Sequence, residues 1–543
     1  MKKTLYFFPL ALFYFFALAQ DKPAVNRPNI LFIVADDLGY ADLGCYGSQI
    51  QTPNIDKLAK AGIRFSNYHS APLCAVARSM FLTGNDNHIA GMGIQGRVTG
   101  IAGYEGRLTD RVITVSALLQ DAGYFTCMAG KWHLGLEPRS NPAAKGFDRS
   151  FVMLEGAANH YNSLGALNQR PKSVYTENGK NAEWPQGAYS TDFYTDKLIE
   201  QITEADKSGK PFFAYAAYTS PHWPLQVDHK YAAKYAGMYD DGYEVQREKN
   251  LSALKKAGMI SGDAKLPALH ERVQRWNGLT PERKKWESRA MELYAGMVDN
   301  LDENIGRLIR YLKEIGKYEN TLIVFVSDNG AAAEDFYNTD TTSTFLKDNY
   351  TDAYSEMGKP HSYISYGRQW AEAGTAPFRY FKGYATEGGI VAPMIVAGPM
   401  VREKGKICHA LVTLMDIAPT FYHLAGVEYP SVFNGKPVQP LRGRSFVHTL
   451  SDIHEPVHND DDVFAFETNG YGFVRKGNWK MVNTVRPFDE STFMLYNLKD
   501  DPGEQTDLKI ILPEKYNELL AAWRQFIADV KIRLPPPAAG EGL

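Results

Sequence analysis

Four short segments of this 543-residue chain contain the residue types that metal and acid–base chemistry require. They are Asp36-Asp37, Lys131-Trp132-His133, Ser220-Pro221-His222-Trp223 and Asp328-Asn329-Gly330. Three carboxylates and an amide carbonyl brought together would repel one another unless a cation lay among them. Oxygen ligands favour a hard ion, so calcium or magnesium fits this set and zinc does not. The lysine and histidine side chains could hold and protonate an oxyanion.

Each segment taken alone also has a simpler interpretation. Asp37 could cap a helix, Asp328-Asn329-Gly330 could form a hairpin turn, and a single histidine is more often structural. The four segments nevertheless share one feature, because each follows an apolar run. In open α/β sheets, ligands bind beyond the carboxyl ends of the strands. We therefore expect the four segments to meet at one edge of a sheet.

The apolar runs predict the strands that would position these segments. They cover residues 29–35, 124–129, 212–218, 321–326 and 390–397, and each is long enough for a buried strand. Helical patterns lie between them. One has Thr52 as its cap, Pro53 at its first position and Gly62 after its end, and another has apolar residues at steps of three and four from Met291 to Ile315. The alternation predicts an α/β fold with a large, mostly parallel sheet and helices on both faces.

The sequence pattern changes at about residue 430. Short apolar stretches at 463–468, 471–483 and 492–498 are separated by Gly, Asn and Asp, which predicts a small antiparallel sheet. A helix opened by Pro513 follows, and the last ten residues are typical of a loose tail. We expect a catalytic α/β domain over residues 21–429 and a C-terminal subdomain of antiparallel sheet and helix over 430–543.

The first residues are typical of a cleaved secretory signal peptide, which we expect over residues 1–20. Lys2 and Lys3 precede an apolar run of about fourteen residues that ends in Ala17-Leu18-Ala19. A short membrane anchor is the alternative, but a spanning helix needs about 20 apolar residues. We therefore expect a secreted or periplasmic protein without a stable membrane anchor.

The balance of charge indicates which partners to expect. Lys and Arg number 59 against 62 Asp and Glu, for a formal net charge of −3. Such a chain has no overall basic field that would attract nucleic acid or an anionic membrane, so an anionic substrate must be drawn in by a local site.

One of the four cysteines differs from the rest in its surroundings. The spacing of Cys45, Cys74, Cys127 and Cys408 matches no zinc or disulfide framework, which favours buried thiols. Cys74, however, precedes a short helical segment that has Arg78 one turn further on. The N-terminus of such a helix would favour negative charge on a nucleophile or on its ester. The alternative is that Cys74 is a small buried hydrophobic residue.

Several motifs, read in order, resemble a known family. They are VADDLG, CAVARSMFLTG, GKWHLG, SPHWPL, SDNGA, FKGYATEGG and LYNLKDDPGE, spread from about Arg27 to Val530. Together they resemble the type I, formylglycine-dependent sulfatases of the alkaline-phosphatase-like superfamily. The resemblance is closest to secreted or periplasmic bacterial arylsulfatases, which share the segments GAANHY and GYEG. It implies a sulfuric ester hydrolase whose substrate is a small sulfate ester.

The resemblance also implies a cofactor and a modification. Cys74 would be oxidised to formylglycine by a formylglycine-generating or equivalent maturation enzyme, although Val76 stands where the family motif has proline. One calcium ion per chain would be held by Asp36, Asp37, Asp328, Asn329 and an oxygen of the modified Cys74. The hydrate of formylglycine would attack sulfur with one hydroxyl and expel sulfate with the other.

The same resemblance implies roles for the remaining site residues. Arg78 and Lys131 would hold the hydrate and the sulfate, and His133 would take the proton that triggers release. His222 and Lys382 would bind sulfate and protonate the leaving oxygen.

Two competing functions remain open from the sequence. One is a phosphodiester or phosphonate monoester hydrolase of the same superfamily, and the other is an unconverted, inactive anion-binding protein. The stretch 334–381 is also open to two interpretations. Its aromatic residues could line a pocket for an aromatic leaving group or could pack within a long surface loop; they are Tyr337, Tyr350, Tyr354, Tyr363, Tyr366, Trp370, Tyr380 and Phe381.

Overall fold

The computed structural model describes residues 27–167, 170–339 and 343–533. The predicted signal peptide and the loose tail lie outside the described residues. Among the helices of the described residues, we find none that combines the length and the apolar character of a membrane span.

The largest element is a ten-stranded mixed sheet with the strand order β11-β2-β10-β9-β1-β8-β4-β5-β6-β7. Strands β9, β1, β8, β4 and β5 form its parallel centre, and β10, β6 and β7 pair antiparallel with their neighbours. The bounds are β1 Asn29–Ala35, β2 Gly62–Phe65, β4 Phe125–Lys131, β5 Arg149–Met153, β6 Tyr175–Glu177, β7 Lys180–Ala182, β8 Phe212–Ala217, β9 Thr321–Ser327, β10 Met394–Ala397 and β11 Ile407–Cys408. The predicted α/β class with a mostly parallel sheet is confirmed.

Four of the five predicted strands form as expected, and the fifth is shorter. The run 390–397 begins as the end of helix α11 (Glu387–Ile390), and only Met394–Ala397 pairs in the sheet. Pro393 stands directly before that strand, where its missing N–H costs no ladder bond. The sequence pattern did not predict β2 and β5, because both strands are short and contain a charged residue, Arg64 and Arg149 respectively.

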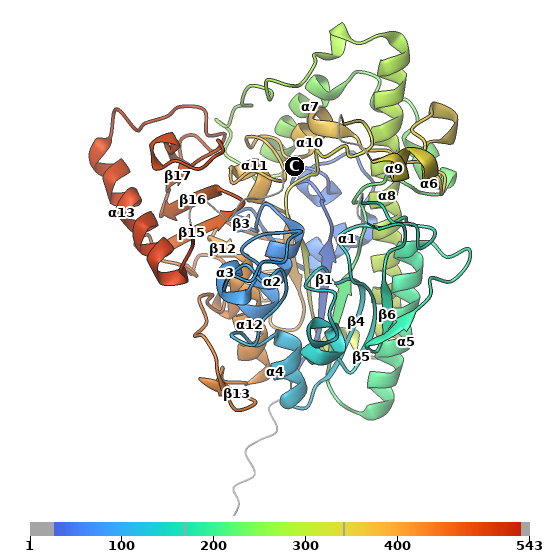
Figure 1. Ribbon diagram of the computed structural model, residues 1–543, viewed down its shortest axis with the longest axis vertical. Helices are drawn as coiled ribbons and strands as arrows, with labels where there is room; N and C mark the ends of the chain where they lie inside the picture. Colours follow the sequence, from blue (N-terminus) through green and yellow to red (C-terminus); the bar gives the residue numbers. More distant parts are fainter. Residues whose placement is uncertain (1–26, 168–169, 340–342, 534–543) are drawn as a thin grey trace, which may run out of the picture.

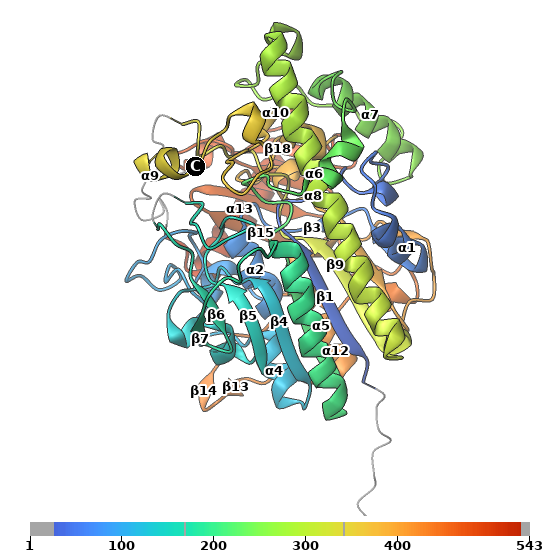
Figure 2. The same ribbon diagram turned by 90° about the vertical axis from the view of Figure 1, so that its right-hand side faces the viewer.

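Helices cover both faces of the large sheet (Figures 1 and 2). The long helices α5 (Ser190–Ser208) and α8 (Pro281–Glu314) cover one face. Helices α2 (Cys74–Thr83), α4 (Val115–Asp121) and α12 (Ile417–Ala425) pack together on the other. Phe32 of β1 meets Phe81 of α2 and Phe421 of α12 at ring-centroid distances of 5.1 and 5.5 Å, and the core continues on the other face with buried residues of α5 and α8. The remaining helices are α1 Pro53–Ala61, α3 Asn87–Ala90, α6 His229–Ala232, α7 Tyr243–Lys256, α9 Thr344–Asn349 and α10 Gly367–Gly374.

Two details of the helices differ from the sequence prediction. Helix α8 begins at Pro281, well before the apolar stripe, because Thr280 caps it by accepting a hydrogen bond from the Arg283 N–H. Helix α1 begins at Pro53 with Thr52 at the N-cap position, as predicted, but the Thr52 side chain makes no capping hydrogen bond. The Thr52 hydroxyl instead accepts from the Gly44 N–H and donates to Asp56.

A second, antiparallel sheet of four strands lies beside the large sheet, as predicted (Figure 1). It contains β15 Val463–Thr468, β16 Tyr471–Lys476, β17 Trp479–Val482 and β18 Met494–Asn497. Helix α13 (Pro513–Val530) packs against it through Leu519 and Trp523, which are fully buried. Two further pairs of short strands lie outside these sheets. They are β3 (Tyr68–His69) with β12 (Val412–Thr413), and β13 (Val432–Phe433) with β14 (Lys436–Pro437).

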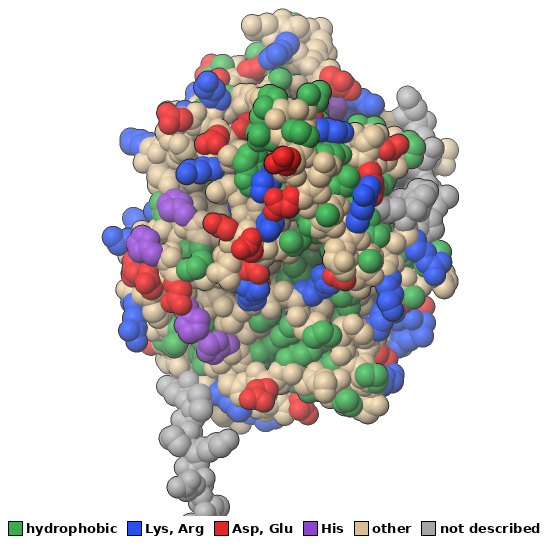
Figure 3. All heavy atoms as spheres, turned by 90° about the vertical axis from the view of Figure 1, so that its left-hand side faces the viewer, with side chains coloured by type: hydrophobic (Ala, Val, Ile, Leu, Met, Phe, Trp, Pro, Cys, Tyr) green, Lys and Arg blue, Asp and Glu red, His purple; other side chains and the backbone are tan. Residues whose placement is uncertain are grey.

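Charged side chains of both signs are mixed over the face of the molecule in Figure 3. Lysine and arginine side chains lie beside aspartate and glutamate, and hydrophobic side chains gather along the middle of that face. This arrangement agrees with the small net charge of −3.

Candidate active site

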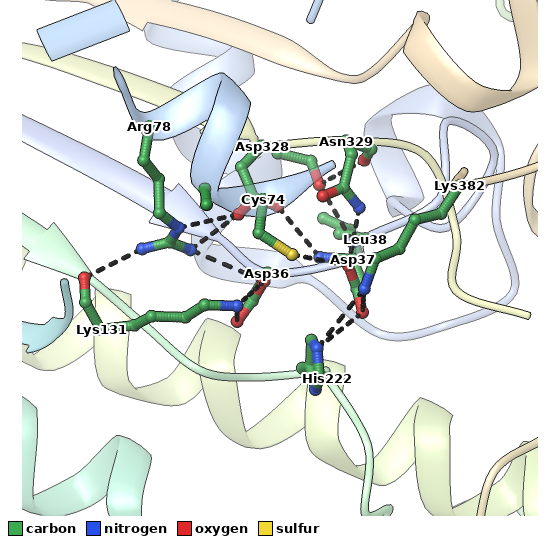
Figure 4. Close-up of polar contacts among 12 residues, drawn as sticks. Asp36, Asp37, Leu38, Cys74, Arg78, Lys131, His222, Asp328, Asn329 and Lys382 are labelled. Carbon is green, nitrogen blue, oxygen red and sulfur yellow. Dashed lines mark hydrogen bonds and ion pairs between the residues drawn. The ribbon is translucent and has the colours of Figure 1, made fainter. Parts of the chain in front are cut away.

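The four polar segments meet at one edge of the large sheet, as predicted (Figure 4). Asp36 and Asp37 follow β1, His222 follows β8, Asp328 and Asn329 follow β9, and Lys131 is the last residue of β4. These strands are parallel neighbours, so their carboxyl ends lie side by side. Two further elements complete the group: Cys74 and Arg78 come from α2, and Lys382 comes from the loop before α11.

Asp37 lies at the centre of the arrangement. Its two carboxylate oxygens contact Asn329 Nδ2 at 2.6 Å, Lys382 Nζ at 2.9 Å, His222 Nε2 at 3.4 Å and Cys74 Sγ at 3.8 Å. Its backbone has a φ of 67°, in the left-handed region that few residues other than glycine adopt. The Asp37 N–H donates to Asp328 Oδ1 at 3.3 Å, which helps to hold this strained conformation at the site.

A second group of ion pairs lies beside Asp37. Lys131 Nζ donates to both oxygens of Asp36, at 3.0 and 2.8 Å. Arg78 donates to Asp328 Oδ2 through Nε at 3.0 Å and through Nη2 at 2.8 Å, and its Nη2 lies 3.6 Å from Asp36 Oδ1. All four side chains are completely buried.

The donor set fits a hard divalent cation. Burial raises the pKa of Asp37 and of Asp328, so additional positive charge would stabilise their ionised forms. Asn329 Oδ1 is buried and has no hydrogen-bond partner among the described residues, which leaves one amide oxygen available to a cation. Ligand atoms of Asp36, Asp37, Cys74 and His222 all lie within 4.8 Å of one another. His222, which was not among the predicted metal ligands, thus lies beside three of them. Asp328, which was, is hydrogen-bonded to Arg78.

Cys74 is the first residue of α2, and its side chain points towards Asp37 (Figure 4). Burial raises the pKa of its thiol well above the ordinary value, although Lys131 and Lys382 act in the opposite direction. The thiol is therefore protonated at neutral pH and is a poor thiolate nucleophile. All four cysteines are free, and only Cys45 is partly exposed, which confirms the prediction of buried thiols.

The tautomer of His222 is fixed by its neighbour. His222 Nδ1 lies 2.7 Å from the Trp223 carbonyl oxygen, so the Nδ1–H donates there and Nε2 faces Lys382 Nζ at 3.4 Å. Burial, reinforced by Lys382 and Lys131, lowers the pKa of His222 well below its usual value. The imidazole is neutral in this arrangement, and a bound anion would raise its pKa.

His160, which was not among the predicted site residues, supports His222. His160 Nε2 lies 3.0 Å from the His222 carbonyl oxygen, and its Nδ1 lies 2.7 Å from Ser190 Oγ. Burial lowers the pKa of His160 to about 4, so the ring is neutral. His160 lies in the segment GAANHY, which was the signal that could have indicated it.

His133 lies at the boundary between these groups and a cavity. Its φ is 58°, and its buried Nδ1 has no hydrogen-bond partner among the described residues. Burial lowers its pKa well below the usual value. The cavity has a volume of about 440 Å³, and His133 and Ala75, the residue after Cys74, both line it.

The aromatic residues of 334–381 do not line this cavity, and most of them pack against other aromatic side chains. Tyr337, Tyr350 and Tyr363 form a buried cluster with Trp223, and Tyr366 stacks on Tyr294 at a ring-centroid distance of 4.7 Å. The cavity is lined by other parts of the chain. The structure therefore favours the packing interpretation of this stretch.

Comparison with known proteins establishes the family of this chain. The sulfatase family model matches residues 28–427, and a model described as the C-terminal part of N-sulphoglucosamine sulphohydrolase matches residues 378–532. The chain therefore belongs to the sulfatase family, with the alkaline-phosphatase-like fold.

The relatives include sulfatases from different kingdoms. An uncharacterized sulfatase of Schizosaccharomyces pombe is 40% identical over 96% of this chain and 97% of its own length. An arylsulfatase of Klebsiella aerogenes is 39% identical over 77% of this chain and 91% of its own. Among solved structures, the crystal structure of Ps i-CgsB has a TM-score of 0.66 and 26% identity, with 92% of each chain covered.

Proposed function

We propose that this protein is a sulfatase that hydrolyses sulfate monoesters, aryl sulfates first and alkyl sulfates second. The observation that carries the proposal is the position of Cys74. It begins α2 beside Asp37 and between the cations Arg78, Lys131 and Lys382, in a chain of the sulfatase family. Three buried cations around one nucleophile suit a sulfate ester, which is an anion, and the sulfate dianion that its hydrolysis releases.

The nucleophile in this proposal is formylglycine formed from Cys74. The buried thiol has a raised pKa and faces carboxylates and an amide, which suits an oxygen nucleophile better than a soft thiolate. A formylglycine hydrate supplies one hydroxyl that takes up the sulfuryl group and a second whose deprotonation expels sulfate. Val76, at the position of the family's proline, is buried within α2.

The chain's own residues then have defined tasks. Asp36, Asp37, Asp328 and Asn329 would hold one calcium ion, which supplies Lewis acidity at the sulfuryl oxygens. Arg78 and Lys131 orient the sulfate, and Asp328 accepts the proton of the nucleophile. His133 takes the proton of the second hydroxyl. His222 and Lys382 bind sulfate from the other side and protonate the leaving oxygen.

The proposal extends to processing and organisation. A signal peptide over 1–20 would direct secretion or export to the periplasm, and a maturation enzyme would convert Cys74. The catalytic domain would cover 21–429 and the C-terminal subdomain 430–543.

Peptide mass spectrometry of the protein from its native host tests the nucleophile. Trypsin releases residues 65–78, which contain Cys74, and residues 112–131, which contain Cys127. We expect formylglycine in the first peptide and an unmodified cysteine in the second, which is an equally buried internal control. Active protein with Cys74 wholly as thiol would refute the mechanism.

Parallel assays with a nitrophenyl sulfate and an aryl phosphonate monoester distinguish a sulfatase from a phosphonate monoester hydrolase. We expect hydrolysis of the sulfate to be the faster of the two.

Substitution of Asp37 tests the metal site. Asp37→Ala removes one carboxylate and leaves Lys382 without its partner, so we expect loss of the ion and at least about a thousandfold loss of kcat. Elemental analysis should find one calcium per wild-type chain and almost none in the variant. Asp42→Asn, at a buried carboxylate hydrogen-bonded to Tyr294, is the matched control and should retain the ion. Stoichiometric zinc in the active wild type would contradict the assignment.

A further inference from the structure

The cavity beside His133 opens from the candidate active site and has a largely apolar wall. Met92, Leu136, Leu154, Leu167 and Ala157 contribute to that wall, and Ala75 connects it to Cys74. Its volume of about 440 Å³ suits a small ring system. Residues of the segments GYEG and GAANHY line this cavity. Neither segment contains a residue to which we assign a catalytic role.

One carboxylate in this wall is incompletely paired. Glu155 Oε2 accepts a hydrogen bond from the Val174 N–H at 2.8 Å, but Oε1 is buried and has no hydrogen-bond partner among the described residues. Burial raises the pKa of Glu155, and Arg170 opposes the rise. An unpaired buried carboxylate oxygen costs free energy that a donor from a ligand would recover.

The other acidic residues of the cavity are paired within the protein. Glu105 accepts from Arg111 at 2.6 Å, and Glu137 accepts from Arg139 at 2.6 Å. Glu137 keeps one oxygen without a partner in the described part of the chain, but its side chain is exposed to water. Glu155 is therefore the acid of this wall whose unpaired oxygen is buried.

Glu155 also lies close to the reacting centre. Gly156 packs against His133 so tightly that a Cβ at Gly156 would lie 2.4 Å from the imidazole Cε1. The backbone that carries Glu155 therefore touches the ring that we assign to proton transfer. A leaving group bound in the cavity would have one end at the sulfate and another part beside Glu155.

We propose that Glu155 determines leaving-group specificity, because its free oxygen accepts a hydrogen bond from a hydroxyl or ammonium group of the substrate. The substrate class is then sulfate esters of small, mainly apolar ring alcohols that carry such a donor. This inference rests on the proposed sulfatase function.

Matched substrates test the selectivity. Hydroxyphenyl sulfates, meta and para, differ from their methoxy counterparts mainly in the donor, so intrinsic reactivity is nearly constant within each pair. We expect the wild type to favour the hydroxy ester of at least one pair by about tenfold or more in kcat/KM. In Glu155→Leu the ratio should fall to within about twofold of unity.

Two further variants test whether the loss of the acceptor oxygen, and not a change in the shape or charge of the cavity, alters the substrate preference. Glu155→Gln keeps the shape and a neutral acceptor, so it should retain part of the hydroxyl preference but lose any preference for an aminomethyl ester over its methyl counterpart. Glu137→Gln alters an arginine-paired acid of the same cavity and should leave the ratios at their wild-type values. Wild-type ratios near unity in both pairs, or ratios that Glu155→Leu does not change, would overturn the inference.

A binding measurement separates this inference from the proposed function. Resorcinol and its dimethyl ether can be compared by calorimetry on wild type and Glu155→Leu, with no turnover required. A preference for resorcinol that disappears in the variant, in a protein inactive on all sulfates, would support the role of Glu155 and refute the sulfatase proposal. Sulfate hydrolysis without either preference would refute the role of Glu155 and leave the sulfatase proposal intact.

Discussion

At the scale of single residues, the site combines side chains that could be predicted from the sequence to different extents. Asp36, His222 and Asp328 were predictable because each follows an apolar run, and parallel strands bring such ends together. Cys74 follows no strand, but its place before a short helix with Arg78 one turn further on set it apart from the other cysteines. Lys382 was indicated by the family resemblance alone. Glu155 was not predictable, since a free carboxylate oxygen is a property of packing that no spacing in the sequence encodes.

His222 provides a prediction that depends on the substrate. If it protonates the leaving oxygen, His222→Ala should slow esters of weakly acidic alcohols by about 10²–10⁴-fold and nitrophenyl sulfate much less. The measurement is kcat/KM for aryl sulfates graded by leaving-group pKa. Lys382 Nζ lies 3.4 Å from His222 Nε2, so Lys382→Ala is the matched comparison. A dependence on leaving-group pKa no steeper in His222→Ala than in wild type would transfer the acid role to Lys382.

At the scale of elements, a buried ion pair joins helix α3 to the C-terminal sheet. His88 of α3 lies 2.9 Å from Glu467 of β15 and 3.2 Å from its own N-cap, Asp86. Burial alone would lower the pKa of His88, but hydrogen bonds to Asp86 and Glu467 outweigh it and raise the pKa to about 9. The sequence could predict α3 and β15 separately at best, because the contact joins residues 379 positions apart.

This contact gives a pH dependence of defined sign. A pKa raised on folding stabilises the protein fully below the unfolded value of about 6.5, and the contribution is lost as pH rises to about 9. This pKa difference means that His88 contributes about 3 kcal/mol to the free energy of unfolding at low pH. The difference in that free energy between wild type and His88→Gln should shrink between pH 6.5 and 9.5 in urea titrations. A difference that stays constant would show that His88 is neutral, and the exposed His361→Gln serves as the control.

At the scale of the whole molecule, one face of the C-terminal sheet shares the core of the large sheet, and its other face packs with α13 in a separate cluster. Phe464, Phe466 and Phe473 of the C-terminal sheet belong to the same hydrophobic cluster as the residues of the large sheet. Lys480 of β17 is completely buried and ion-paired with Glu387 of α11 at 2.6 Å and with Glu504 at 2.9 Å. The change of pattern near residue 430 predicted the second sheet, but it contained no information on how tightly that sheet is attached.

We therefore expect the intact protein to unfold in a single calorimetric transition, although it contains two sheets. Lys480→Met would leave Glu387 and Glu504 buried without their cation, at a cost of about 3–5 kcal/mol. If the sheets are one cooperative unit, this variant should lower the temperature of the single transition without splitting it. Lys476→Met, on the neighbouring strand at the surface, is the matched control and should change the transition little. Two separate transitions in the wild type, or a new low-temperature transition confined to the C-terminal sheet in Lys480→Met, would show instead that the subdomain beyond residue 430 folds independently.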